Sequence, residues 1–509
     1  MVGDPIGQQR CFELLESLRE LIPDDHLLVQ VDKVLDLSWV RDEVRSVYCE
    51  GRGRPSLDPE AVLRLMVAGA LLGIIHDREL MRAAQDSLAI RWFAGFGLDR
   101  KLPDHSSLTR IRQRWGEALF AKLLERTIGQ CVAAGLVGGS TVHVDATLMR
   151  ANASLGSFVQ EHVSAVVAAN SAAAGSDEGD PPSQREGAGG DVKSSGDAKA
   201  EDGEGAAVPG ETKPSKKGKS GKRVSRTDRD ARLARKKKGE PCEPVYKVHA
   251  VADDEQGIVV DVRVTRGDVA EGHELVSQVD AVGALTGTPV KGVVADAGYG
   301  HARNYAELED RGCVAVIPSQ APSRHPGGMP AWRFKHDGRH DVVRCPGGAK
   351  LRRCRENAEG VTYKARVSDC ARCRFRERCV PAKSKVRSVL RVHGHAALVR
   401  ARRAQWRGEI RGTRLYSRRF FLAEGLFAWA KREFGLCRAA RRGLWTVTIQ
   451  ARLAFVAMNL RKLGAYQASV DLWARLCGLQ GRLVGLVGRI RLLWRHFGPA
   501  PAPPATLAA

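Results

Sequence analysis

The sequence lacks any apolar run long enough to cross a bilayer. Its longest such run, from Leu65 to Ile75, is much shorter than the ~20 residues that a transmembrane helix requires. The opening residues, MVGDPIGQQRCFELLESLRELI, also lack the basic region, apolar core and small-residue cleavage site of a secretory signal. We therefore expect a cytoplasmic protein without a membrane partner.

Acidic residues are scarce relative to basic ones. Asp and Glu number 58 against 81 Lys and Arg, so the formal net charge is +23 over 509 residues. This balance favours a polyanionic partner, with nucleic acid first and an anionic membrane surface second. The length exceeds one ordinary core, so we expect two or three domains. Twelve cysteines in a chain expected to remain in the cytoplasm favour metal binding or burial over a disulfide framework.

Residues 1–140 are predicted to form a helical DNA-binding domain. Asp58 followed by Pro59 is typical of an N-cap and a first helical residue, and apolar residues then recur at helical spacing. A later helix is predicted to carry three arginines in its first turns, as the recognition helix of a helix-turn-helix would: Arg110, Arg112 and Arg114. The alternative is a solvated basic face on a helical bundle.

Residues 155–240 have too few large apolar side chains to offset the entropy lost on ordering, so we expect a disordered low-complexity insertion. Strand and helix patterns surround it, at residues 141–154 and 241–319. VYKVHAVA and IVVDVRVT flank the turn-rich DDEQG and predict a β-hairpin, which a helix, a strand, a helix and a further strand follow. This order predicts a mixed α/β sheet with flanking helices. Residues 411–465 are expected to complete this unit, before a C-terminal helix and tail at 466–509.

Residues 320–410 form a Cys-rich segment. Cys370 and Cys373 have the Cys-x2-Cys spacing that lets two thiolates bind one tetrahedral zinc ion. Cys379 is a natural third ligand and Cys345 a fourth. The alternative is that these thiols are reduced cysteines in a small core.

Three carboxylates occupy related places in the predicted elements. Asp145 is predicted to end the strand in VHVDATLMRAN, Asp296 ends the strand in VKGVVADAGYG, and Glu424 lies on the helix RRFFLAEGLFAWAKREFG. Singly, each has an ordinary explanation as a cap, a turn residue or a surface charge. At one sheet edge they would repel unless cations lay between them, and magnesium takes such oxygen ligands. Two such ions, about 3.5–4 Å apart, suit the cutting and joining of a DNA backbone.

Several motifs together resemble the DDE transposases of bacterial insertion sequences, which have a ribonuclease-H-like catalytic core. They occur in the same order: VHVDATLMRANAS, RTDRDARLARKKKG leading into YKVH, VVADAGYG, AEGLFAWAKREFG and GLWTVTIQARLAFVAMNLRKL. The segment from RGRPSLDPEAVLRLMVAGALLGI to DHSSLTRIRQR resembles the helical N-terminal domain of that group. The resemblance covers about residues 50–155 and 225–465, and relatives commonly carry an inserted subdomain where the Cys-rich segment lies.

The resemblance implies a site and a reaction. Asp145, Asp296 and Glu424 would be catalytic and would bind two magnesium (or manganese) ions. DNA contacts are implied for Tyr416, Arg419 and Lys431, although Tyr416 and Arg419 lie one residue further from the glutamate than the family's usual spacing. The implied reaction is cleavage at the element's ends, followed by strand transfer of the freed 3′-hydroxyl into target DNA without a covalent protein intermediate.

The implied partners are the element's terminal inverted repeats and target DNA. A homodimer or higher oligomer is expected on DNA, in a nucleoid-associated cytoplasmic protein. The alternatives are a metal-dependent nuclease without strand transfer and a non-catalytic DNA-binding regulator. Four other acids are predicted to be turn or surface charges, of which the last is close enough to Glu424 to compete with it: Asp253, Asp254, Asp261 and Glu433.

Overall fold

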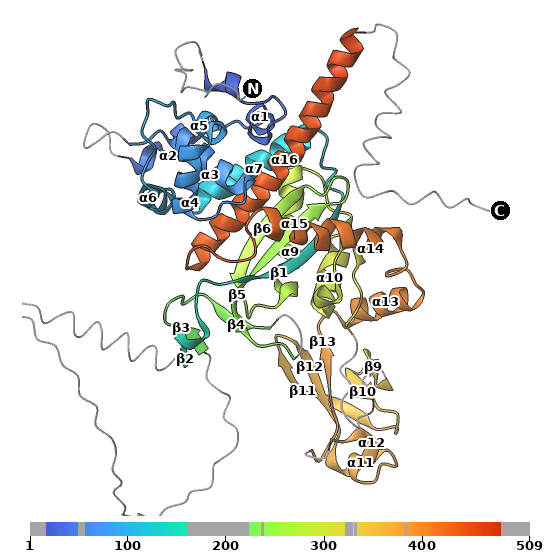
Figure 1. Cartoon of the computed structure of the whole chain (residues 1–509). Helices are drawn as coiled ribbons and strands as arrows, with labels where there is room; N and C mark the ends of the chain where they lie inside the picture. The colour runs from blue at the N-terminus through green and yellow to red at the C-terminus, as the bar shows by residue number, and fades with distance from the viewer. Residues whose placement is uncertain are drawn as a thin grey trace, which may run out of the picture.

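The computed structural model describes residues 17–48, 56–160, 223–235, 239–320, 329, 333–381 and 384–479. The predicted α/β class is confirmed: a helical N-terminal region and a long C-terminal helix adjoin a six-stranded sheet, and a five-stranded sheet extends away from them (Figure 1). Within these residues, no helix is both long and apolar enough to cross a membrane.

The N-terminal region is helical, as predicted. Asp58 accepts the backbone N–H of Glu60, and Pro59 takes the first helical position of α3. Its buried residues share one core with the six-stranded sheet. The elements are η1 (Leu18–Leu21), α1 (Leu27–Asp32), α2 (Val40–Val44), η2 (Arg45–Val47), α3 (Pro59–Leu71), α4 (Asp77–Asp86), α5 (Leu88–Phe93), α6 (His105–Trp115) and α7 (Ala118–Ala133).

The six-stranded sheet has β1 at its centre. The strands are β1 (Thr141–Arg150), β4 (Arg232–Ala234), β5 (Glu243–Asp253), β6 (Val259–Arg266), β7 (Gly292–Val294) and β8 (Val314–Val316). β5 runs antiparallel to β1, and β4 and β6 pair antiparallel with β5, which confirms the predicted hairpin. On the other edge of β1, β7 and then β8 continue the sheet in parallel.

β1 does not end at Asp145, contrary to the prediction. The strand continues to Arg150 because its second half still pairs with β5 and its end meets the chain near Arg438. The N–H of Arg150 donates to the carbonyl of Cys437 at 3.1 Å, and the N–H of Ala439 donates to the carbonyl of Arg150 at 2.7 Å. Asp145 is therefore a mid-strand residue on the central strand.

The ends of the predicted disordered insertion are ordered, which corrects its boundaries. The described elements there are η3 (Leu155–Ser157), β2 (Phe158–Gln160) and β3 (Arg223–Ser225), in addition to β4. β2 and β3 pair antiparallel and bring the two flanks together. Residues 161–222 and 236–238, which make up most of the predicted insertion, lie outside the described residues.

Short helical elements follow β6 and β7 and complete this part of the fold. They are η4 (Glu271–His273), α9 (Leu275–Thr286), η5 (Ala297–Tyr299) and α10 (Ala302–Asp310). α9 contacts β6 and α7, whereas α10 contacts β8. η4 and η5 contact each other, so the segments after β6 and after β7 meet.

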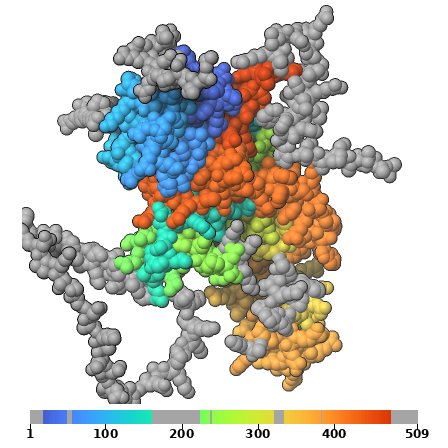
Figure 2. Space-filling model, in the orientation of Figure 1, coloured from blue at the N-terminus to red at the C-terminus, as the bar shows by residue number. Residues whose placement is uncertain are grey.

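The Cys-rich segment forms an antiparallel sheet with its own small core, and it projects from the rest of the molecule (Figure 2). The sheet order is β13-β12-β11-β10-β9. The elements are β9 (Lys335–Asp337), β10 (Val342–Arg344), β11 (Lys350–Asn357), β12 (Gly360–Lys364), α11 (Val367–Ala371), α12 (Arg376–Cys379), β13 (Ser388–Val392) and α13 (His395–Trp406).

The C-terminal part is helical. The elements are α14 (Arg414–Arg419), the π-helix η7 (Phe420–Gly425), α15 (Leu426–Glu433) and α16 (Leu444–Leu479). α16 is one 36-residue helix, so the predicted boundary near residue 466 is wrong. It contacts α1, α3, α7 and β6 and thereby joins the N-terminal helices to the sheet. Residues 480–509 lie outside the described residues.

A buried ion cluster ties the N-terminal helices to the segment before α16. Asp77 at the start of α4 accepts from two nitrogens of Arg112 at 2.7 Å each, and a nitrogen of Arg441 lies 2.6 Å from the same carboxylate. We expect Asp77→Asn to lower the free energy of unfolding by about 3–5 kcal/mol, because the buried Arg112 and the half-buried Arg441 lose their counter-charge. Urea unfolding followed by circular dichroism measures this change.

Asp42→Asn is the matched control. Its pair with Arg45 is exposed on both sides, so we expect a loss of no more than about 1 kcal/mol. Equal losses in the two variants would contradict the structural role of the Asp77 cluster.

Candidate active site

Two of the candidate acids lie next to each other because of strand register. In the parallel pairing of β1 with β7, His143 is opposite Val294. Asp145 and Asp296 each follow two residues later, so they occupy the same level on neighbouring chains. Parallel neighbours lie about 4.8 Å apart, which makes the two carboxylates close neighbours at this edge of β1 and β7.

Local hydrogen bonds orient both carboxylates. One oxygen of Asp145 accepts the N–H of Ala146 at 2.9 Å. Asp296 caps η5, where its Oδ1 accepts the N–H of Gly298 at 2.7 Å. Each aspartate therefore keeps at least one oxygen for another partner.

Arg419 connects the third acid to this pair. Its guanidinium donates to Asp145 Oδ2 at 3.1 Å and to Glu424 Oε1 at 2.8 Å. Burial alone would lower the pKa of Arg419, but the charges of Asp145, Asp296 and Glu424 raise it. The structure thus brings all three predicted acids around one guanidinium.

A π-helix explains why Arg419 reaches Glu424 across five positions. In an α-helix, residues i and i+4 share a face, whereas the wider π turn brings i and i+5 together. η7 spans Phe420–Gly425, between the arginine and the end of the turn that holds the glutamate. The wider turn accommodates one residue more than an α-helical turn and so brings Arg419 to the Glu424 carboxylate.

Lys431 lies on the same side of β1. Its ammonium donates to the hydroxyl of Thr147 at 2.6 Å. Side chains two apart in a strand point to one face, so Thr147 and Asp145 face the same helical segment. One segment, from α14 through η7 to α15, therefore presents Arg419, Glu424 and Lys431 to this face of β1. Tyr416, one turn earlier, packs partly buried against a small apolar cluster rather than against the acids.

Burial and like charges disfavour ionisation of Asp145. Burial is the main cause that raises its pKa to about 6, and Arg419 and the Ala146 N–H oppose the rise. The charges of Asp296 and Glu271 add to it. Sequence analysis did not single out Glu271, which carries no signal beyond its place in the turn after β6.

The donor set at this site fits hard divalent cations. It consists of carboxylate oxygens, which magnesium and manganese prefer. A buried phenol also lies near these charges: within the described ranges, the Tyr299 hydroxyl has no hydrogen-bond partner. Burial raises the pKa of Tyr299 most, and the charges of Asp145, Glu271 and Asp296 add to the rise. However, across the part of the chain that the structure describes, no three or more His, Cys, Asp or Glu side chains are already arranged to hold a metal ion. Arg419 would have to withdraw from Asp145 and Glu424 before a cation could bind them together.

The predicted recognition helix is α6, and its three arginines differ. Arg110 and Arg114 are exposed, Arg110 bonds Ser106 at 2.7 Å, and Arg114 lies over the ring of Tyr48. The DNA-binding prediction for Arg112 is wrong, because its side chain is only 7% exposed and is bound to Asp77.

The four other acids lie outside this cluster. Asp253 is buried rather than a surface charge, since it accepts backbone N–H groups in the turns around it. Asp254 contacts His143 and Arg418. Asp261 pairs with Arg263, and Glu433 pairs with Arg432 and Arg461. Glu433 therefore has its own basic partners and does not replace Glu424 beside Arg419.

The predicted zinc ligands line one small cavity in the second sheet's core. Cys345, Cys370, Cys373 and Cys379 all border it. Burial and then the neighbouring thiols raise the pKa of Cys379 against the opposing charge of a nearby arginine. Cys370 and Cys379 are also part of that sheet's buried core, as the alternative prediction requires.

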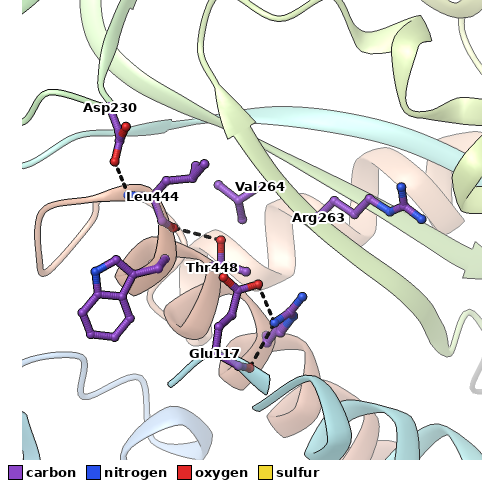
Figure 3. Close-up of a pocket in the computed structure, with 8 residues that line it drawn as sticks. Glu117, Asp230, Arg263, Val264, Leu444 and Thr448 are labelled. Carbon is purple, nitrogen blue, oxygen red and sulfur yellow. Dashed lines mark hydrogen bonds and ion pairs between the residues drawn. The ribbon is translucent and has the colours of Figure 1, made fainter. Parts of the chain in front are cut away.

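A larger cavity of about 520 Å³ lies near the start of α16, away from the acids (Figure 3). Its charged residues are already engaged: Asp230 accepts the N–H of Leu444 at 3.0 Å, and Arg452 pairs with Glu117 at 2.8 Å. Asp228 accepts the N–H of Gly443 at 3.2 Å. The aspartates of the RTDRDARLA motif thus cap α16, and this cavity is a structural junction.

Two transposase family models match separate parts of the chain. Residues 16–114 match the family described as Transposase domain (DUF772), and residues 344–464 match the family described as Transposase DDE domain. No curated protein matches the chain. Among solved structures, it is similar to a cryo-EM structure of a piggyBac transposase synaptic complex with hairpin DNA, at 9% identity and a TM-score of 0.28. That alignment covers 98% of this chain and 89% of the other, but it is too loose to support a conclusion about the fold.

The raised pKa of Asp145 predicts a pH-dependent stability in metal-free protein. The folded state holds this proton more tightly than the unfolded state, so the wild type loses stability as pH rises through about 6. Asp145→Asn has no such titration. Between pH 5 and 7.5 the variant should therefore gain about 1–2 kcal/mol relative to the wild type, measured by urea unfolding with a chelator present.

Glu433→Gln provides the comparison for this titration. The pKa of Glu433 is lowered, so the carboxylate is ionised in both states across that pH range. The difference in free energy of unfolding between Glu433→Gln and the wild type should therefore remain constant across this pH range. A constant difference for Asp145→Asn as well would refute the expected cost of ionising Asp145.

Proposed function

The chain belongs to the DDE-type DNA transposases, and from this premise we propose that Asp145, Asp296 and Glu424 are its three catalytic acids. The observation that carries this proposal is the single guanidinium of Arg419, which is bonded to Asp145 and Glu424 and electrostatically coupled to Asp296. A nearby positive charge stabilises the ionised form of closely placed acids, as a divalent cation at the same place would.

We propose magnesium or manganese as the cofactor, held by these acids. DDE transposases use divalent metal ions, and a bound pair would activate the attacking oxygen and stabilise the leaving oxygen. The chain's own contribution is positional. β1 and β7 hold two carboxylates on a rigid sheet, whereas Glu424 approaches from a helical segment.

Arg419 has two roles in this proposal. Without ions, it neutralises the acids and keeps them together. Once it leaves them, its planar group is suited to bind a DNA phosphate close to the reacting bond. Lys431, on the same segment, would hold a neighbouring phosphate, and Tyr416 would support the helix that carries Arg419.

We propose a ribonuclease-H-like arrangement for the six-stranded sheet. Its support is the order β6-β5-β1-β7-β8, in which the first three strands are antiparallel and β1, β7 and β8 are parallel. The proposed acids lie on β1 and just after β7, where the sheet changes from antiparallel to parallel pairing. The division into an N-terminal DNA-binding unit, an interrupted catalytic core and a Cys-rich subdomain belongs to the same proposal.

The proposed reaction is hydrolysis at the ends of an insertion sequence, followed by attack of the freed 3′-hydroxyl on target DNA. The DNA partners are then the terminal inverted repeats and the target. The charge of +23 favours such partners through phosphate contacts, and Arg110 and Arg114 remain exposed for them. Two ends require two active sites, so a homodimer or higher oligomer is proposed on DNA, in a nucleoid-associated protein.

We also propose that the four cysteines bind one structural zinc ion. One support is that the four cysteines surround one cavity. Another is that two of the sulfurs lie close to Gly347, where an added Cβ would be 3.0 Å from Cys373 Sγ and 3.6 Å from Cys345 Sγ. The N–H of Phe375 donates to Cys373 Sγ at 3.4 Å, as backbone amides do for zinc thiolates.

Cys373→Ser should therefore remove the zinc from the purified protein and lower its thermal stability, because structural zinc stabilises small folds. Elemental analysis and a thermal melt with and without chelator measure both effects. Cys354→Ser is the control, since Cys354 is exposed and lies outside the cavity. Wild-type protein that contains no zinc and melts identically with chelator would overturn the proposal.

Asp145→Asn, Asp296→Asn and Glu424→Gln should each reduce DNA cleavage by about 10³-fold or more, with DNA binding nearly unchanged, because each removes a charge needed only for the chemistry. The assay combines end-bearing DNA, a supercoiled plasmid and magnesium, and separates cleaved from joined products.

Glu433→Gln should cleave like the wild type, since the Glu433 carboxylate pairs with Arg461 and Arg432 instead of Arg419. Cleavage by wild-type protein without joined products would favour a nuclease without strand transfer. Normal cleavage by Asp145→Asn would refute the site.

A further inference from the structure

Glu271 places a fourth carboxylate at the same centre. Gly298 gives the geometry: a Cβ added there would lie 2.8 Å from Asp296 Oδ1 and 2.9 Å from Glu271 Oε2. The two oxygens are therefore no more than about 5.7 Å apart, the sum of those two distances. Only glycine leaves this space open, and two carboxylates this close repel each other without a cation.

The two turns that carry these acids are fixed to each other. Asn304 is buried, and its amide donates to the carbonyl of Gly272 and to the carbonyl of Tyr299 at 3.0 Å each. Gly272 follows Glu271 directly, and Tyr299 ends the turn that Asp296 caps. The approach of Glu271 to Asp296 is thus built into the core rather than made by mobile side chains.

Lys247 pairs with the Oε1 side of the Glu271 carboxylate. Its ammonium lies 3.5 Å from Oε1, and it is anchored by donating to the carbonyl of Val269 at 2.7 Å. The other oxygen, Oε2, is the one that faces Gly298. An ion pair with Lys247 therefore explains the orientation of Glu271 but leaves Oε2 directed toward Asp296.

An unsatisfied polar group marks the space between these acids. Tyr299 is fully buried, and its hydroxyl has no hydrogen-bond partner among the residues that the structure describes. That hydroxyl is electrostatically coupled to Asp145, Glu271 and Asp296 together. A buried phenol among three carboxylates is an ordered polar position that water bound to a cation would satisfy.

We propose that Glu271 is a fourth acid of the metal centre, which supplies Oε2 to the divalent cation on the Asp296 side, directly or through water. Lys247 is its positioning residue. This inference rests on the proposed function, because it assigns Glu271 to the same ions as Asp145 and Asp296.

The test measures ion binding without the reaction. Purified full-length protein is titrated with Mn²⁺, and free Mn²⁺ is followed by electron paramagnetic resonance. Glu271→Gln should weaken the affinity about 10-fold or more, since outer ligands of metal sites contribute on this scale. Glu274→Gln is the control on the same segment, because Glu274 pairs with Arg263 instead and should keep parental affinity. Circular dichroism confirms that the variants fold.

The outcomes separate this inference from the proposed function. Parental Mn²⁺ affinity in Glu271→Gln, with weakened affinity in Asp145→Asn and Asp296→Asn, would overturn the role of Glu271 alone. Parental affinity in all three variants would overturn the proposed metal site as well. If Glu271→Gln does not fold, Glu271→Asp keeps the charge but withdraws the carboxylate by one methylene. That variant should also bind Mn²⁺ more weakly, and parental affinity there would overturn the inference.

Discussion

The site depends on one electrostatic constraint: a buried carboxylate, Asp145, lies beside other carboxylates that are partly or fully exposed, and some positive charge must lie among them. In the structure that charge is the guanidinium of Arg419, which bonds Asp145 and Glu424. Ionisation of Asp145 nevertheless remains unfavourable, because burial raises its pKa to about 6 despite the nearby charge of Arg419. A protein keeps such an arrangement when a bound ion relieves it, because buried like charges otherwise lower stability.

A strand pair and a helical segment, which differ in rigidity, position these carboxylates. The parallel register of β1 with β7 sets the spacing of Asp145 and Asp296 through main-chain hydrogen bonds. The third acid comes from a helix whose π turn rotates Glu424 onto the face of Arg419. π turns are rare in helices and occur mostly at functional positions, since each costs regular hydrogen bonding. In the proposed site, the sheet is therefore the fixed side, and the helix is the side that would adjust to a bound ion.

Sequence patterns predicted the secondary-structure elements better than the long-range contacts of individual side chains. The hairpin of β5 and β6, the N-cap at Asp58 and the position of Asp296 after β7 all follow from local chemistry. The burial of Arg112 does not, because its partner Asp77 lies 35 residues earlier and only the fold brings them together. β1 was expected to end at Asp145 because a charge in a core strand is unusual, yet Arg419 from a distant helix compensates that charge.

Glu271 shows the same limit at the site itself. It lies in a turn, without strand or helix periodicity, and only the packing of η4 on η5 brings it near Asp296. The motifs predicted acids that lie within continuous patterns, such as VVADAGYG, whereas the proposed fourth acid is brought in by tertiary contacts that no motif describes.

Ion binding and DNA binding are linked through Arg419 in the proposed mechanism. The same guanidinium cannot bond both carboxylates and a phosphate, since its donors are limited and planar. A cation that takes over Asp145 and Glu424 therefore frees a basic group at the place where the DNA backbone must lie. Protons compete with that cation below about pH 6, where Asp145 becomes neutral. Charge neutralisation of the acids and capture of the DNA backbone are thus two states of one side chain, and their exchange couples assembly of the metal centre to the arrival of its substrate.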